Sequence, residues 1–168
     1  MEHTAYANWG GHYVKLTWLP GVELPDPAFV TSVHGVCMDQ GKMMLVHVQG
    51  RGFNLPGGHV EIGETPVDTL LRECMEEGYV KCGDSRYIGA IEVSHEENPL
   101  FDPNGKYPLI GYQLFYRTTI IECLPYRQEN ECTARIWVEP ELASQVMEDH
   151  NLAYLIVDEA FRQAKDVL

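Results

Sequence analysis

Three glutamates share one side of a predicted helix. Thr65 is a good N-cap residue, a proline follows it at the first helical position, and Gly78 is a natural helix stop. Glu73, Glu76 and Glu77 fall at positions i, i+3 and i+4, where like charges repel by roughly a few tenths of a kcal/mol per pair. Such a group is either a solvated acidic face or a set of oxygen ligands for a hard cation such as Mg²⁺ or Mn²⁺.

The segment before this helix contains a pair of glycines. Residues 51–61 read Arg-Gly-Phe-Asn-Leu-Pro-Gly-Gly-His-Val-Glu, and paired glycines allow the backbone to approach a ligand closely. With the helix, this segment resembles the Nudix box, Gly-x5-Glu-x7-Arg-Glu-U-x-Glu-Glu-x-Gly-U, where U is a bulky apolar residue. The match begins at Gly58, continues with Glu64 and reaches Arg72 at the spacing that the pattern requires. The chain is therefore similar to Nudix hydrolases of the MutT-like kind.

The end of the box departs from the family pattern. After the glutamate pair the pattern requires one residue and then glycine, whereas here Gly78, Tyr79 and Val80 follow directly. We interpret the difference as a one-residue deletion, and a tyrosine substituted at the glycine position is the alternative. Either change affects the end of the helix and leaves its acidic side intact.

The resemblance implies a role for each matching residue. The ligands of Mg²⁺ or Mn²⁺ would be Glu73, Glu76, Glu77 and the carbonyl of Gly57. Arg72 would pair with Glu64 and orient the catalytic helix. The metals would bridge phosphate oxygens and help to make a nucleophilic water, whose attack at phosphorus breaks a diphosphate linkage. The general base is either Glu73 or a residue of a distant loop, for which Glu131 is the best candidate; otherwise Glu131 is a surface acid.

Four residues around the glycine pair are candidate substrate contacts: Arg51, Phe53, Gly58 and His59. His59 is otherwise a partly exposed strand residue, and Phe53 is otherwise a core aromatic. Cys74 lies on the apolar side of the helix and is expected to pack rather than to react. His34 and His47 lie in predicted strands without metal-ligand spacing, so they receive no role in the site.

The resemblance predicts a metal-dependent pyrophosphohydrolase that cleaves a diphosphate linkage in a nucleoside diphosphate derivative. A nucleoside triphosphate or a related nucleotide is the expected small-molecule partner. One alternative is a non-catalytic Nudix-fold module that binds a nucleotide and regulates another protein. A second alternative is an interaction domain whose acidic helix faces solvent. The presence of all three glutamates favours the enzyme, because such binding modules usually lose them, and the sequence leaves a homodimer open.

The elements that must position these residues form one α/β (α+β) domain over residues 1–168. Apolar runs predict strands, and turn residues separate them. The predicted strands cover residues 14–18, 29–38, 43–48, 87–93, 109–121 and 134–138. The resemblance implies a Nudix-type α/β/α sandwich, with a mixed β-sheet flanked by the Nudix helix and a C-terminal helix.

Apolar positions predict which sides of the two helices are buried. In the first helix the stripe consists of Val67, Leu70, Leu71 and Cys74. Asn151 is a candidate N-cap for a second helix that reaches about residue 165, and its buried side consists of Leu152, Leu155, Ile156 and Ala160. The loop over residues 99–108 is long for a hairpin, and we expect it to gate or shape the substrate site through Phe101 and Tyr107. The alternative is an ordinary surface loop whose aromatic side chains pack on the sheet.

Composition excludes several other classes of protein. The chain has 168 residues and a formal net charge of −13, so it lacks the basic surface of a general nucleic-acid-binding protein. An anionic substrate would then need bound cations. The five cysteines include no Cys-x-x-Cys pair, which argues against a zinc ribbon and a disulfide framework. The polar start of the chain and the lack of a long apolar run predict a cytoplasmic protein without a membrane span.

Overall fold

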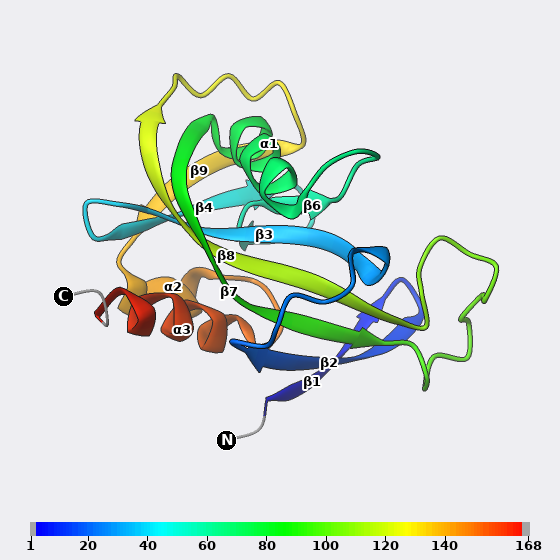
Figure 1. Cartoon of the computed structure of the whole chain (residues 1–168). Coiled ribbons are helices and arrows are strands. Elements are labelled where there is room, and N and C mark those ends of the chain that lie inside the picture. The colour runs from blue at the N-terminus through cyan, green and yellow to red at the C-terminus, as the bar shows by residue number, and fades with distance from the viewer. Residues whose placement is uncertain (1–2, 166–168) are drawn as a thin grey trace.

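The computed structural model describes residues 3–165 (Figure 1). The strands of its sheet are β1 Thr4–Trp9, β2 His12–Pro20, β3 Val30–Asp39, β4 Lys42–Val48, β5 Gly52–Asn54, β6 Gly57–His59, β7 Val80–Ser94, β8 Ile110–Cys123 and β9 Cys132–Val138. The helices are α1 Pro66–Gly78, α2 Ala143–Val146 and α3 Ala153–Lys165, with 3₁₀ turns at Pro27–Phe29 and Pro140–Leu142.

The sheet is mixed, as predicted. Its main path runs β1-β2-β7-β8-β3-β4-β5, with β6 paired to β3 and β9 paired to β4. β3 and β8 run parallel, whereas β7 and β8 form a long antiparallel pair. Because β3 also pairs with β6, Val33 lies opposite Gly58 and His34 lies opposite Gly57. This pairing fixes the glycine pair beside the middle of the sheet.

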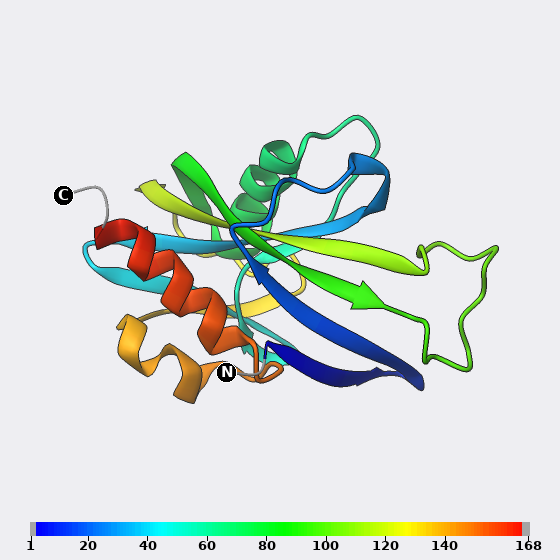
Figure 2. The same cartoon turned by 60° about the horizontal axis from the view of Figure 1, so that its bottom comes forward.

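Helices cover both faces of the sheet, which confirms the predicted α/β/α sandwich. α1 lies on one face, and α2 and α3 lie on the other (Figure 1 and Figure 2). Each face has its own apolar core. The core beneath α3 includes Leu16, Trp18, Leu45, Ile91 and Ile156. The core beneath α1 includes Val33, Met44, Val46, Leu70 and Leu114. Removal of these side chains from water holds both helices against the sheet.

α1 begins as the sequence predicts. Asp68 N donates a hydrogen bond to the Thr65 hydroxyl at 3.2 Å, and Thr65 N donates one to the Asp68 carboxylate at 2.9 Å. This reciprocal pair is a capping box, and it satisfies backbone donors that a helix N-terminus leaves unpaired. The first turn of the helix is therefore fixed by residues that are local in sequence.

The buried side of α1 is narrower than the predicted stripe. Leu70 and Cys74 are fully buried, but Val67 and Leu71 are each 37% exposed. Leu70 packs directly over Gly35 of β3, where an added Cβ would lie 2.7 Å from Leu70 Cδ1. Close contact at this glycine sets the rotation of the helix, so Val67 and Leu71 lie at the edge of the contact.

The end of α1 distinguishes the two interpretations of the box. The helix includes Gly78, and Tyr79 follows at φ 53° and ψ 42°, a left-handed conformation that usually requires glycine. Tyr79 thus occupies the position of the family's glycine, which corresponds to a substitution rather than to the deletion that we inferred. Arg135 donates to the carbonyls of Gly78 at 2.8 Å and Tyr79 at 3.2 Å and so pairs the last carbonyls of the helix.

Each predicted strand falls within or overlaps an observed one. The C-terminal helix is confirmed, but it begins at Ala153, so Leu152 and not the predicted cap Asn151 precedes it. The predicted buried positions of this helix segment are all buried: Leu152, Leu155, Ile156 and Ala160. β1, β5, β6 and α2 were not predicted, since they are short or, in β1, lack clear alternation. Within residues 3–165 no helix is long and apolar enough to cross a membrane.

Candidate functional site

A cleft of about 1440 Å³ opens beside the acidic side of α1. Its other walls come from the segment around the glycine pair, from strands of the sheet and from residues 147–150 before α3. The predicted site residues that line it are Arg51, Gly57, Gly58, His59, Arg72, Glu73, Glu76, Glu77 and Glu131. Predicted site residues from three separate parts of the sequence, within 51–59, within 72–77 and at Glu131, therefore meet in one cavity.

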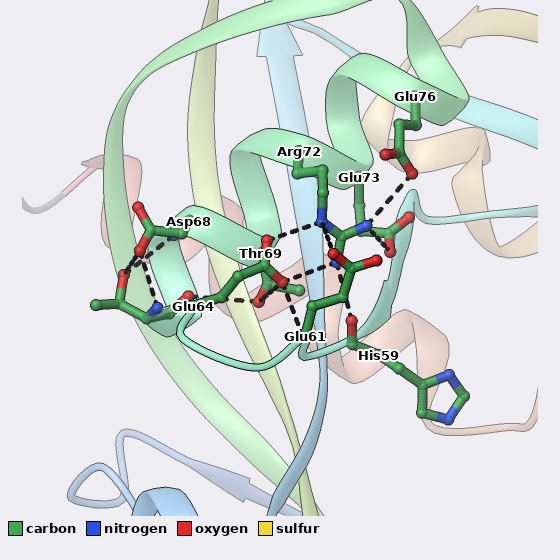
Figure 3. Close-up of polar contacts among 9 residues, drawn as sticks. His59, Glu61, Glu64, Asp68, Thr69, Arg72, Glu73 and Glu76 are labelled. Carbon is green, nitrogen blue, oxygen red and sulfur yellow. Dashed lines mark hydrogen bonds and ion pairs between the residues drawn. The ribbon is translucent and has the colours of Figure 1, made fainter.

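Arg72 joins several of these residues (Figure 3). Its Nε and Nη2 donate to Glu64 Oε2 and Oε1 at 2.7 and 2.9 Å, which is a bidentate pair. Its Nη1 donates to Glu73 Oε1 at 2.8 Å and to Glu76 Oε2 at 3.3 Å. Nη2 also donates to the carbonyl of His59 at 3.0 Å. One guanidinium thus fixes two carboxylates of α1 relative to the segment that carries the glycine pair.

Glu64 acts on this arrangement from outside the cleft. Hydrogen bonds from Arg72 lower the pKa of Glu64 to about 2, and Glu64 in turn raises the pKa of Arg72. Glu61 N and the Thr69 hydroxyl also donate to Glu64 Oε1, at 2.8 and 3.1 Å. Because Glu64 contacts Arg72 and the turn before α1, its place fits a positioning role.

Two of the glutamates have little contact with water. The Glu73 side chain is 13% exposed, and burial raises its pKa. Burial also raises the pKa of Glu77 to about 6. The Gly57 N–H donates to Glu77 Oε1 at 2.7 Å, and the Cys132 thiol donates to Glu77 Oε2 at 3.2 Å. Buried carboxylates with raised pKa values are groups that a nearby cation would stabilise.

Both glycines of the pair are needed for close approach. A Cβ on Gly58 would collide with the Glu73 carboxylate, and a Cβ on Gly57 would collide with the His34 ring and the Val33 carbonyl. The backbone can pass between β3 and α1 only because neither residue has a side chain. This contact places Gly57, Gly58 and the α1 carboxylates in the same cleft.

Arg51 and Glu131 meet on the exposed side of the cleft. Arg51 Nη2 lies 3.7 Å from Glu131 Oε2, and the two side chains are 70% and 80% exposed. An ion pair this exposed contributes little to stability, so either side chain is free to exchange its partner for a ligand. The structure places the candidate loop base in the same cleft as the glutamates of α1.

The loop over residues 99–108 reaches the cleft through one aromatic residue. Tyr107 lines the cleft, and its hydroxyl lies 3.0 Å from His59 Nε2. Burial lowers the pKa of His59. Phe101 instead packs beside His95, with ring centroids 5.4 Å apart. Of the two aromatics named from the sequence, Tyr107 is therefore the one that lines the cleft.

Phe53 does not line the cleft in the described part of the chain. Its ring packs against the core beneath α3 and lies edge-on to His47, with centroids 4.9 Å apart. Successive residues of a strand point to opposite sides, and it is the next residue of β5, Asn54, that lines the cleft. The expected substrate contact of Phe53 is thus replaced by a packing role.

His34, Asn54 and His150 are among the polar residues of the cleft that were not predicted as site residues. His34 stacks on Phe115 with centroids 5.2 Å apart, and burial lowers its pKa to about 4, so it is neutral near pH 7. Asn54 Oδ1 and His150 Nδ1 are buried atoms that have no hydrogen-bond partner among the described residues. Asn54 stands next to the Leu-Pro-Gly-Gly segment, a local signal, whereas nothing in the sequence links His34 and His150 to the cleft.

A family profile for the NUDIX domain matches residues 28–158, most of the chain. The chain belongs to the Nudix family. The matched range begins within the 3₁₀ turn before β3 and ends within α3, so it includes the glycine pair, the Arg72 network and the cleft. The Nudix box of this chain is the segment from Gly58 to Val80, with Tyr79 at its glycine position.

A curated relative shares part of this Nudix sequence. The chain is 34% identical over 62 residues to the candidate 8-oxo-dGTP diphosphatase YtkD of Bacillus subtilis. The match covers 37% of this chain and 39% of the relative, so it spans well under half of the relative's length.

Solved Nudix structures share the fold over most of the chain. The pyrophosphohydrolase BsRppH of Bacillus subtilis superposes with a TM-score of 0.69 at 19% identity, over 92% of each chain. A Nudix hydrolase from Nitrosomonas europaea superposes with a TM-score of 0.61 at 20% identity, over 83% of this chain and 95% of that one. At these identities the agreement establishes a common fold.

Proposed function

We propose that this Nudix protein is a metal-dependent pyrophosphohydrolase that cleaves a diphosphate linkage in a nucleoside diphosphate derivative. A nucleoside triphosphate or a related nucleotide is the preferred substrate. The observation that carries the proposal is the Arg72 network, which fixes Glu73 and Glu76 at the edge of the cleft. An acidic helix that only faced water would have no need to bury Glu73 and Glu77, since burial of a carboxylate costs free energy.

The cleft has the donor set for a divalent metal, which Nudix hydrolases generally use. Glu73, Glu76, Glu77 and the carbonyl of Gly57 would hold Mg²⁺ or Mn²⁺, since hard cations prefer oxygen ligands. Arg72 engages one oxygen of Glu73 and one of Glu76, which leaves the second oxygen of each as a ligand atom. When bound, the metal supplies charge neutralisation at phosphate oxygens and a more acidic water.

Side chains of this protein would bind the phosphates and move the proton. Arg51 and His59 line the same cleft as the carboxylates, and there they would contact phosphate oxygens. A phosphate that takes Arg51 from its exposed pair with Glu131 leaves the Glu131 carboxylate free. Glu131 would then accept a proton from the water that attacks phosphorus, as a general base. Glu64 would keep Arg72, and through it Glu73, in one orientation.

The rest of the cleft fits the nucleoside part of a nucleotide. Asn54 Oδ1 and His150 Nδ1 are buried polar atoms without partners among the described residues, and a base or sugar would supply the missing hydrogen bonds. The net charge of −13 argues that cations in the site, rather than the protein surface, attract the anionic substrate. The name of the Bacillus subtilis relative, a candidate 8-oxo-dGTP diphosphatase, supports a nucleoside triphosphate.

A substrate screen tests this proposal. The purified protein is incubated with nucleoside triphosphates, 8-oxo-dGTP and nucleotide sugars, with Mg²⁺, with Mn²⁺ or with excess chelator, and the products are separated by chromatography. We expect turnover of at least one compound in the presence of metal and no turnover with chelator. Full activity in excess chelator would contradict the mechanism. Nucleotide binding by calorimetry without hydrolysis of any compound would instead support the regulatory-module alternative.

A further inference from the structure

Three cysteines meet beneath α1, on the side away from its carboxylates. Cys37 on β3, Cys74 on α1 and Cys82 on β7 bring their Sγ atoms within 4.8 Å of one another. The Sγ atoms of Cys37 and Cys74 are 3.3 Å apart. These two residues are fully buried, whereas Cys82 is only partly buried. The cluster therefore has two fixed thiols and a third that gives access from solvent.

We propose that Cys37, Cys74 and Cys82 form a binding site for a thiophilic d¹⁰ cation, with Zn²⁺ as its occupant. Zn–S bonds of about 2.3 Å place the sulfur atoms of a tetrahedral site about 3.8 Å apart. The observed spacing, 3.3 Å for Cys37 with Cys74 and at most 4.8 Å for the other pairs, brackets this value. Small rotamer changes would close the trio around one ion.

A hydroxyl beside the sulfur atoms is the candidate fourth ligand. Thr118 of β8 is buried and lies opposite Cys37 in the parallel pairing with β3. The Thr118 hydroxyl lies 2.9 Å from the hydroxyl of Ser85, so it is already held in place. Three sulfurs and one neutral oxygen complete the four-coordinate geometry that Zn²⁺ prefers.

The chemistry of the donors separates this site from the carboxylates of the cleft. Sulfur ligands select Zn²⁺ and other soft ions, whereas carboxylate and carbonyl oxygens select Mg²⁺ and Mn²⁺. Each thiol that becomes a ligand exchanges its S–H bond for an S–Zn bond and releases a proton to water. The bound ion would join β3, α1 and β7, and it would stabilise the fold by mass action whether or not the protein hydrolyses nucleotides.

Cadmium is a spectroscopic probe for this site, because thiolate–Cd²⁺ bonds give an ultraviolet charge-transfer band. The full-length protein is reduced, its five thiols are counted after unfolding, and Cd²⁺ is titrated with Mg²⁺ in excess. The matched variants are Cys82→Ser, which removes the accessible ligand, and Cys123→Ser, which changes an exposed cysteine outside the cluster. Cys37→Ser tests a second ligand, and circular dichroism establishes that each variant is folded.

We expect one Cd²⁺ per chain, displacement of the band by Zn²⁺, and a higher melting temperature with Zn²⁺ present. Even outer-shell partners of a metal are worth about 10- to 100-fold in affinity, so loss of a direct ligand in Cys82→Ser should cost more than about 100-fold. Cys123→Ser should bind like the wild type. Absence of the band in fully reduced wild type, or equal binding by folded Cys82→Ser, would overturn the proposal.

Discussion

The two sides of α1 stabilise the same helix by different means. On the cleft side, Glu73 and Glu76 are held by directional hydrogen bonds from Arg72, and Glu76 keeps 48% of its side chain exposed. On the sheet side, Leu70 and Cys74 have no exposure and are held by close contact. Orientation matters on the first side, and exclusion of water matters on the second. Substitutions on α1 should therefore separate into those that change activity and those that change stability.

Glu76→Gln should have the largest effect on the cleft side. The amide preserves size and shape but removes one charge from the proposed metal ligands, so turnover should fall by at least about 100-fold. The melting temperature should change little, since the side chain is half exposed. Steady-state kinetics measure the turnover, and thermal unfolding measures the melting temperature. Glu122→Gln, which removes an exposed carboxylate from its pair with Lys81 on the sheet, is the matched control and should retain full activity.

Cys74→Ser should have the opposite signature. The hydroxyl is placed in a fully buried position of the apolar core, and burial of such a group lowers the free energy of unfolding by about 1–3 kcal/mol. The kcat of the folded fraction should stay close to that of the wild type. Urea unfolding and kinetics on the same preparation check the prediction. Loss of chemistry at unchanged stability would mean that the roles of the two sides are reversed.

The buried carboxylate on the cleft side should leave a mark on stability as a function of pH. The pKa of Glu77 is raised to about 6, above its unfolded value near 4.3, so the folded state binds the proton more tightly. In metal-free protein the unfolding free energy should therefore gain about 2 kcal/mol from this group as the pH falls from 7.5 to 4.5. Urea unfolding of wild type and Glu77→Gln at each of the two pH values isolates the contribution of Glu77 to the unfolding free energy. If the unfolding free energies of the two proteins differed by the same amount at both pH values, the prediction would be wrong.

The smallest effect is expected at the far side of the cleft. Replacing residues 100–106 by an Asn-Gly turn removes most of the loop that carries Tyr107. Because Tyr107 meets His59 at the cleft, KM or the ranking of substrates should change while metal binding and the melting temperature stay near normal. Kinetics over the active substrates of the screen measure the change. Identical constants for every substrate would leave the loop without a role in recognition.

Local features of the site could be read from the sequence. The Thr65–Asp68 cap and the pairing of Arg72 with Glu64 depend on residues at most eight positions apart, and the structure has both. Spacing along a helix fixes which side chains meet, so the acidic side of α1 was also predictable. Val67 and Leu71 were predicted to be buried but are partly exposed. The rotation of α1 is set by the contact of Leu70 with Gly35, which is distant in the sequence.

Features that depend on strand pairing could not be read in this way. Cys37, Cys74 and Cys82 meet only because β3, α1 and β7 are stacked, and their spacing in the sequence matches no metal motif. Phe53 was misassigned because a strand of three residues gives too little alternation to decide which side chain points into the cleft. Tertiary contacts of this kind determine which residues line the walls of the cleft, whereas local spacing determines which carboxylates lie at its acidic edge.

The left-handed Tyr79 at the end of α1 has a consequence for local unfolding of the neighbouring connection. Its hydroxyl accepts a hydrogen bond from Glu129 N, and its carbonyl accepts one from Leu124 N, both at 2.8 Å. Two hydrogen bonds thereby join the end of α1 to the connection that leads to Glu131. In hydrogen exchange, Tyr79→Gly should accelerate the amide of Glu129, which loses the hydroxyl that accepts its hydrogen bond. The amide of Leu124 should keep its protection, because its acceptor is a backbone carbonyl that glycine retains.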